Sequence, residues 1–406
     1  MQDQPENSSH HAPRDGFHND PHAEREDYFP FTMKRLLFFS MLAALASLPA
    51  SAQWLPISNV TAKIENSEMG GPFFKIEYEL GVKDLSPAAP AYVFARYRES
   101  ATTGWKLIPQ TALRGDHDIV ESAGKKKMLW WGLGSLGLTN APQLEVRVRG
   151  IRMVRVPGGA FKMKIVPGGG YDESKGQIES ATLPTFWMAK YETTVGMYAD
   201  YLNETGKDGG GWHKHMANPE RCGITRNPGD TYTVAPGREK FPINYVSWYD
   251  ATAFLDWCGL RVPTEAEWEK TLRGGLYLDG DEAKKVPNPK PDRKYPWGDE
   301  APDAGGVWRC NADGDADGFA QLAPVGSFEK FASPYGACDI VGNVAELTLD
   351  WYATSFHAGL DGYRMARGGS FMDPPAGCDA VTGATQLPVK RSSITGFRAL
   401  RDARTK

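Results

Sequence analysis

The chain has 406 residues and a formal net charge of −4 at pH 7. Its length is enough for two or three domains with a substantial core. The acidic balance, together with the absence of a lysine- and arginine-rich run with interleaved aromatic residues, argues against a nucleic-acid-binding surface. Its 44 glycines and 12 tryptophans favour a fold rich in turns and loops that large aromatic side chains hold together.

The first 52 residues are predicted to precede the folded protein. Residues 1–32 are polar, and we expect a disordered leader or an upstream segment that is not translated. Residues 33–52 are typical of a secretory signal peptide: Lys34 and Arg35 precede an apolar run over 36–48 and a small-residue cleavage site. No later apolar run is long enough to span a bilayer. We therefore expect an exported protein, periplasmic, at the cell surface or secreted, with no transmembrane segment after signal cleavage.

Residues 53–150 show the alternation of apolar and polar side chains that is typical of strands with one buried face. The clearest run has Phe74, Ile76, Tyr78 and Leu80 as its apolar members. Short strands between glycine, proline and aspartate turns predict an all-β sandwich of the immunoglobulin or fibronectin kind. We expect this domain to be a spacer or docking module without chemistry of its own.

A second domain is predicted over residues 151–406, with α+β character. Helices are expected to begin after Thr194, Ser247 and Thr264, because each can cap a helix N-terminus and the last two form capping boxes. Cys258 falls on the apolar face of the second helix and is expected to be a core thiol. The glycine-rich stretch 208–240 is expected to be an irregular surface excursion.

Two oxygen-rich loops follow, at 311–319 and 339–346. Asp339, Asn343 and Glu346 place oxygen-bearing side chains in one short turn, and Gly342 allows the backbone to fold tightly there. Hard cations such as calcium bind six to eight oxygens of this kind. For either loop alone an acidic surface turn is the alternative. An EF-hand is excluded, because Pro324 stands where its bidentate glutamate belongs.

Eight short motifs occur in this order: P-G-G-A-F at 157–161, K-Y-E-T-T at 190–194, V-S-W-Y-D-A at 246–251, R-V-P-T-E-A-E-W-E at 261–269, Y-P-W-G-D-E at 295–300, D-I-V-G-N-V-A-E at 339–346, R-G-G-S-F at 367–371 and G-F-R at 396–398. The series resembles the formylglycine-generating enzyme, or sulfatase-modifying factor, family over about residues 154–404. The resemblance implies a C-type-lectin-like fold with a mixed sheet, few helices and much ordered loop.

The resemblance also implies two structural calcium sites. One would use Asn311, the Ala312 carbonyl, Asp317 and the Phe319 carbonyl. The other would use Asp339, the Gly342 and Val344 carbonyls and Glu346. Every side-chain ligand that these motifs require is present in the chain.

The activity that the resemblance implies is the oxidation of a sulfatase cysteine to formylglycine, with oxygen and copper(I) held by a cysteine pair. Cys378 matches the second cysteine of that pair, but Asp373 stands at the first. A carboxylate is a hard ligand and cannot replace a thiolate at a two-sulfur copper(I) site. Ser370 of the pocket is retained, and three other pocket positions depart from the family pattern: Ala345, Pro374 and Ile394. We therefore do not expect copper.

The favoured hypothesis is an exported, non-catalytic binding or structural protein. Its calcium-stabilised domain would recognise a protein or a glycan of the cell envelope, since loops on a rigid scaffold suit recognition. The alternative is the copper- and oxygen-dependent oxidase, or a variant that uses Cys378 as a single thiolate. In that case Cys378 and Ser370 would be the catalytic residues. The related iron-dependent sulfoxide synthases need a histidine-rich metal site, for which residues 53–406 offer only four histidines.

Overall fold

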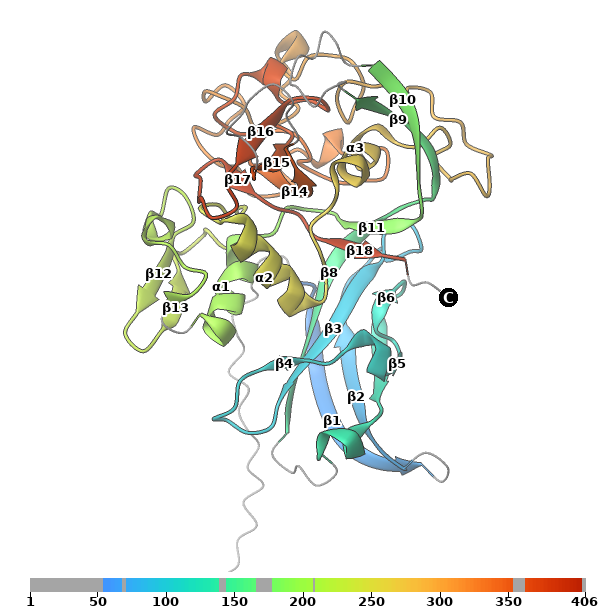
Figure 1. Cartoon of the computed structure of the whole chain (residues 1–406), viewed down its shortest axis with the longest axis vertical. Coiled ribbons are helices and arrows are strands. Elements are labelled where there is room, and N and C mark those ends of the chain that lie inside the picture. The colour runs from blue at the N-terminus through green and yellow to red at the C-terminus, as the bar shows by residue number, and fades with distance from the viewer. Residues whose placement is uncertain are drawn as a thin grey trace, which may run out of the picture. The chain divides into compact units, whose positions relative to one another are not determined.

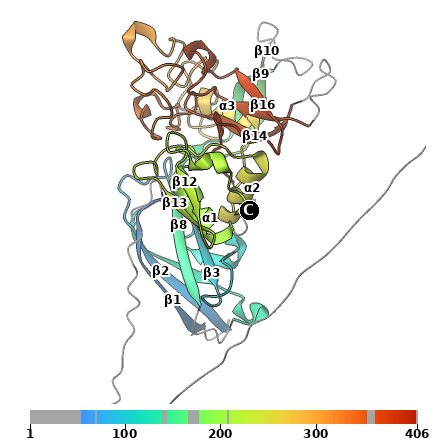
Figure 2. The ribbon, with the colours of Figure 1, turned by 90° about the vertical axis from the view of Figure 1, so that its left-hand side faces the viewer.

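The computed structural model of the chain describes residues 54–67, 71–138, 144–165, 177–206, 209–352 and 362–403 (Figures 1 and 2). The predicted leader and signal peptide, residues 1–52, lie outside this range. In the part that is described, mixed sheets and three α-helices alternate with long ordered loops, as predicted. None of the helices in these ranges has the length and apolar character needed to cross a membrane. The C-type-lectin-like classification stays a prediction.

The first sheet is antiparallel and contains four strands from the N-terminal region. Its order is β1 (Ile57–Ser67), β2 (Gly71–Leu80), β7 (Gly124–Trp130) and β5 (Leu113–Gly115). The alternation predicted for residues 74–80 is confirmed, because the four apolar side chains of β2 are buried and the residues between them are partly exposed. The sheet therefore buries one face.

The second sheet contains strands from both halves of the chain. Its order is β18 (Leu400–Asp402), β11 (Phe186–Ala189), β8 (Glu145–Val156), β3 (Ala91–Arg98) and β4 (Lys106–Leu107), and β6 (Asp118–Val120) also pairs with β3. The strand β8 pairs with β3 up to Arg152 and with β11 from Met153 onward. The predicted domain boundary at 150/151 therefore falls inside a strand, and one sheet joins the two predicted domains.

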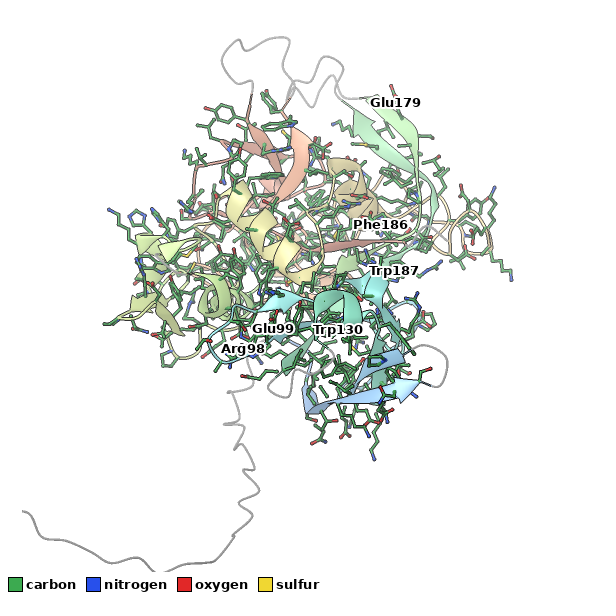
Figure 3. All side chains as sticks on the ribbon, turned by 60° about the horizontal axis from the view of Figure 1, so that its bottom comes forward. Arg98, Glu99, Trp130, Glu179, Phe186 and Trp187 are labelled. Carbon is green, nitrogen blue, oxygen red and sulfur yellow. The ribbon has the colours of Figure 1, made fainter. Side chains whose placement is uncertain are left out.

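The two sheets share a hydrophobic core. Apolar side chains of β2 and β7 pack with those of β3 and β8, and Trp130 is fully buried among them (Figure 3). Figure 2 shows β1 and β2 of the first sheet beside β3 and β8 of the second. This is the layering expected of packed sheets. The immunoglobulin- or fibronectin-like assignment stays a prediction.

The three α-helices begin where their capping residues predicted. They are α1 (Val195–Thr205), α2 (Trp248–Cys258) and α3 (Glu265–Arg273). The side chain of Thr194 accepts the N–H of Met197, and the capping boxes after Ser247 and Thr264 are both formed. Cys258 is fully buried in the core that α1 and α2 share, as predicted.

The stretch 208–240 differs from its prediction. It contains the hairpin of β12 (Ile224–Asn227) and β13 (Thr231–Val234), and it contributes buried side chains to the core around α1. Asn203 at the end of α1 donates to the carbonyl of Tyr232 and accepts its N–H, so the hairpin is tied to the helix. The interpretation as a surface excursion was wrong, because alternate apolar residues of a short hairpin can reach a neighbouring helix.

The remaining strands form a hairpin and a small sheet. The hairpin pairs β9 (Gly159–Ile165) with β10 (Gln177–Leu183), and the sheet has the order β16 (Gly383–Gln386), β15 (Arg364–Arg367), β14 (Ala345–Trp351) and β17 (Thr395–Gly396). Between α3 and β14 the chain forms only loops and short 3-10 turns. Both oxygen-rich loops lie before or at the start of β14.

Candidate functional site

The first oxygen-rich loop is closed by Asp317, whose carboxylate accepts the N–H groups of Ala312 at 2.9 Å and Phe319 at 2.8 Å. Burial raises the pKa of Asp317. The side-chain oxygen of Asn311 is buried and has no hydrogen-bond donor, and the side-chain oxygen of Gln321 is in the same state. A buried acceptor without a donor is costly, and a cation would satisfy it. This set of oxygens therefore fits a hard cation such as calcium.

The second predicted calcium set fits less well, because Glu346 already has a cationic partner. Arg398 donates to its carboxylate at 2.6 and 3.0 Å, and Trp268 donates through Nε1 at 3.0 Å. Glu346 and Arg398 are both fully buried. The guanidinium thus stands where a metal ion would neutralise the carboxylate. As arranged, the second set offers Asp339 and main-chain carbonyls but no free glutamate oxygen.

Two buried carboxylates, those of Glu192 and Glu346, and the partly exposed carboxylate of Asp339 lie near this arginine. The carboxylate of Glu192 accepts the side-chain amide of Asn343 at 2.9 Å and the N–H of Val344 at 3.3 Å. Burial, with Asp339 and Glu346 nearby, raises the pKa of Glu192 well above its ordinary value. Burial also raises the pKa of Asp339 to about 6.

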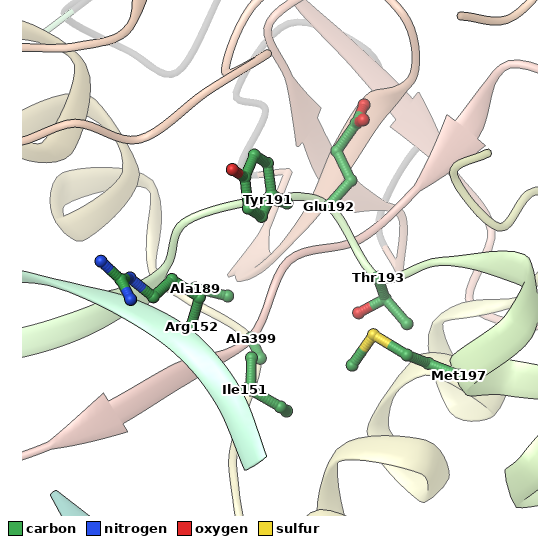
Figure 4. Close-up of a pocket in the computed structure, with 8 residues that line it drawn as sticks. All are labelled: Ile151, Arg152, Ala189, Tyr191, Glu192, Thr193, Met197 and Ala399. Carbon is green, nitrogen blue, oxygen red and sulfur yellow. The ribbon is translucent and has the colours of Figure 1, made fainter. Parts of the chain in front are cut away.

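Figure 4 shows Glu192 between Tyr191 and Thr193 at the edge of a cavity of about 10 Å³, which is close to the volume that one water needs. Within the described ranges, no three side chains of histidine, cysteine, aspartate or glutamate converge as metal ligands. The three carboxylates of Glu192, Asp339 and Glu346 therefore outnumber the cation Arg398 beside them, but they do not converge on one point as metal ligands.

Ser370, a position that the resemblance implies to be catalytic, lies in a turn that Asp373 closes. Ser370 is fully buried, and both its N–H and its hydroxyl donate to the carboxylate of Asp373, at 2.8 and 2.6 Å. The carboxylate at the first cysteine position therefore closes a tight turn. It is not directed at Cys378.

Cys378 instead has a sulfur neighbour that the sequence analysis did not identify. Its thiol lies beside the thiol of Cys310, and both side chains are buried in one hydrophobic cluster. The neighbouring thiol of Cys378 and burial raise the pKa of Cys310 well above its ordinary value. Cys310 directly precedes Asn311 of the first oxygen-rich loop. Nothing in the spacing of the two cysteines signals this contact.

Two of the three other departing positions carry apolar side chains into packed surroundings, whereas Pro374 is exposed. Ala345 is buried in the core around α1 and α2, and Ile394 packs against the cluster that contains Val344 and Phe371. Pro374 precedes a short 3-10 turn that ends before Cys378. The positions that define the family's chemistry are therefore part of the packed interior or of closed turns.

A group of apolar side chains, most of them exposed, lies elsewhere on the same domain. We call it the aromatic face and define it by Tyr249, Leu349, Trp351, Leu387 and Val389, which are exposed, and the partly exposed Trp248; the buried Arg364 packs against its tryptophans. The guanidinium carbon of Arg364 lies 3.8 Å from the ring centre of Trp248 and 3.4 Å from that of Trp351. The N–H of Trp248 donates to the carbonyl of Pro388, which joins α2 to the 387–389 loop.

Comparisons with known proteins show which family the chain resembles. The model of the sulfatase-modifying factor enzyme 1-like domain matches residues 140–403. The chain is 29% identical to a formylglycine-generating enzyme of Streptomyces coelicolor over 317 residues, which cover 64% of this chain and 93% of the relative. It is 28% identical to the inactive C-alpha-formylglycine-generating enzyme 2 of Bos taurus, over 61% of this chain and 87% of the relative.

A hercynine oxygenase of Mycolicibacterium smegmatis is 28% identical, over 60% of this chain and 61% of that protein. Among solved structures, PvdO from Pseudomonas aeruginosa matches with a TM-score of 0.43 and 20% identity, over 62% of this chain and 95% of its own. The family match spans more than half of the sequence and contains all eight motifs. The chain belongs to the family of sulfatase-modifying factor enzyme 1-like domains.

Proposed function

We propose that the protein is an exported, non-catalytic binding protein of the cell envelope, built on a calcium-stabilised member of this family. One observation carries the proposal: Cys378 is fully buried, while the position of its expected copper partner holds Asp373 in a turn with Ser370. A copper(I) site for cysteine oxidation needs two sulfur ligands that a peptide can approach. Asp373 offers no sulfur, and the thiol that does lie beside Cys378, that of Cys310, is buried with it, so a peptide cannot approach the pair.

The family comparison supports the same proposal. The relative from Bos taurus is named as an inactive member, so the scaffold exists without the oxidase activity in at least one related protein. Here two of the three other departing positions, Ala345 and Ile394, pack into hydrophobic surroundings. Packing of this kind stabilises a domain without serving a reaction.

For calcium, we propose the first set of ligands as the principal site. Asn311 and Asp317 would supply side-chain oxygens, and Ala312 and Phe319 would supply carbonyls. The buried side-chain oxygens of Asn311 and Gln321 are the support, because both lack a donor. The ion would neutralise Asp317 and hold the loop in place without taking part in chemistry.

The aromatic face is the recognition surface that we propose. Tyr249 and Trp351 are each about half exposed, at 54% and 51%, and Val389 is 68% exposed. A contiguous exposed apolar patch usually marks an interaction site. Its tryptophan and tyrosine side chains are of the kinds that dominate protein interfaces, while Leu349 and Leu387 add aliphatic surface that sugar hydroxyls would not favour. We therefore favour a protein partner over a glycan.

The proposal is tested by immobilising the full chain and measuring saturable binding from envelope extracts and glycan arrays. We expect one protein partner whose binding falls at least tenfold in Trp351→Ala and Tyr249→Ala. Leu136→Ala is the matched control, because Leu136 is also half exposed but lies on the N-terminal region. A partner bound equally well by all variants would exclude the aromatic face.

The alternative function, the copper-dependent oxidase or a single-thiolate variant, has a direct assay. The purified chain is titrated with copper(I) and incubated with a sulfatase-derived cysteine peptide, and the peptide mass is followed. We expect no formylglycine. Conversion that requires Cys378 would overturn the non-catalytic assignment, and Cys338→Ser serves as the control for loss of a buried thiol.

A further inference from the structure

The two thiols that meet in the core of this domain come from segments far apart in the chain. Cys310 precedes the first oxygen-rich loop, and Cys378 follows the short turn Pro375–Gly377. The segments are joined next to the thiols, because the N–H of Asp313 donates to the carbonyl of Asp373 at 2.9 Å. The side chains of Cys310 and Cys378 are 2% and 0% exposed and belong to the same buried hydrophobic cluster.

Two motif glycines leave the space that the thiols occupy. A Cβ atom on Gly342 would lie 3.2 Å from the Cβ of Cys310, and one on Gly369 would lie 3.2 Å from the sulfur of Cys378. Both glycines have positive φ angles, 76° and 68°, which favour glycine. The backbone at each glycine therefore lies close to one of the two cysteines. Cys222 differs from this pair, because its thiol donates to the side-chain oxygen of Asn244 at 2.7 Å.

We propose that Cys310 and Cys378 form a disulfide when the chain folds in an oxidising thiol–disulfide pool, with oxidised glutathione as the model oxidant. One cysteine sulfur, as thiolate, attacks the glutathione disulfide and releases one reduced glutathione. The second cysteine sulfur then attacks the mixed disulfide and releases the other. One sulfur–sulfur bond breaks, one forms, and the two protein hydrogens pass to the two glutathione thiols.

The bond would tie the loop of the first calcium set to the turn of Ser370 and Asp373. It would close a long segment of chain, and such a link stabilises mainly by restricting the unfolded state. Because both sulfurs are buried, exchange is expected during folding or local opening and to be slow on the folded protein. This inference does not depend on the proposed binding function.

The test uses the full chain, unfolded and then refolded in oxidised or in reduced glutathione, followed by alkylation, digestion and mass spectrometry. We expect a linked peptide pair containing Cys310 and Cys378 in the oxidised sample, with the other three cysteines alkylated. The oxidised form should melt several degrees higher than the reduced form. Cys310→Ser and Cys378→Ser should abolish both effects, whereas Cys338→Ser should keep them.

Two results would overturn the proposal. One is wild-type protein in which all five cysteines are alkylated after refolding in oxidised glutathione. The other is a linked pair that contains Cys222, Cys258 or Cys338. If the serine variants fail to fold, the comparison of oxidised with reduced wild-type protein still decides the question, because it needs no substitution.

Discussion

Two buried acidic sites in this molecule are neutralised in opposite ways. Where the second sheet meets α1 and α2, Glu204 accepts hydrogen bonds from Arg96 at 2.9 Å, Arg147 at 2.7 Å and Arg149 at 2.8 Å. At the start of β14, Glu192, Asp339 and Glu346 share the single cation Arg398. The first site has cations in excess, and the second has carboxylates in excess.

The pKa values of the two sites move in opposite directions. Burial tends to raise the pKa of Glu204, but Arg149, Arg147 and Arg96 outweigh it and lower the value. At the second site burial raises the pKa values of Glu192 and Asp339. At the first site the arginines of β3 and β8 therefore neutralise Glu204 of α1 fully, and these ion pairs connect the two predicted domains. The second keeps a surplus of negative charge that a proton or a cation must offset.

The largest effect is expected for Glu346→Ala. The substitution leaves Arg398 buried without its carboxylate, and breaking a buried ion pair in this way costs about 3–5 kcal/mol. Urea denaturation of the variant measures the loss. A loss below about 1 kcal/mol would mean that Arg398 finds Glu192 or Asp339 instead, and Glu192→Gln in the same background would then become destabilising.

A slightly smaller effect is expected for Glu204→Gln, of about 3 kcal/mol, because the amide leaves three arginines near one another without an anion. Arg147 is 40% exposed and can turn toward solvent, which limits the cost. Urea denaturation again gives the value. The matched control is Glu145→Gln, which removes an exposed pair with Arg98 and should cost under about 1 kcal/mol.

Removing calcium is expected to cost about 2–3 kcal/mol at a free-ion concentration near one hundred times the dissociation constant. Excess chelator should lower the melting temperature of the wild type, and Asp317→Asn should remove this sensitivity. Asp315→Asn, in the same loop but exposed, is the control and should behave like the wild type. A melting temperature unchanged by chelator would exclude the calcium site.

The smallest effect concerns acid. The pKa of Glu204 is lowered in the folded state, so the unfolded chain binds the proton more readily. The stabilisation is complete above the ordinary value of 4.5 and is lost as the pH falls below it. We expect the free energy of unfolding to fall less steeply with acid in Glu204→Gln than in the wild type. Identical slopes would show that Glu204 titrates normally.

Local features of the fold could be read from the sequence. The three helices begin at Thr194, Ser247 and Thr264 because each cap is formed between residues three positions apart. The alternation in β2 predicted its buried face because successive side chains of a strand point to opposite sides of the sheet. The first calcium set stays a prediction that the family resemblance implies; its members Asn311 and Asp317 belong to one loop.

The prediction for residues 208–240 failed because their burial depends on contacts with α1, not on their own composition. Glu192 belongs to the motif K-Y-E-T-T and Arg398 to the motif G-F-R, but neither motif indicates that the two charged side chains lie near each other in the core. Cys310 was missed for the same reason, because its partner is distant in the chain.

The sequence by itself determined the family, the helix starts, the sheet alternation and the presence of Asp373 where the resemblance implies a cysteine. Only the tertiary structure decided that Glu346 is paired with Arg398, that Cys378 lies against Cys310, and that β8 joins both predicted domains in one sheet. The physical reason is the separation, along the chain, of the residues that each feature brings into contact. Caps, turns and alternation depend on neighbours within a few residues, whereas the pairing of buried charges and thiols depends on which distant segments the folded chain brings together.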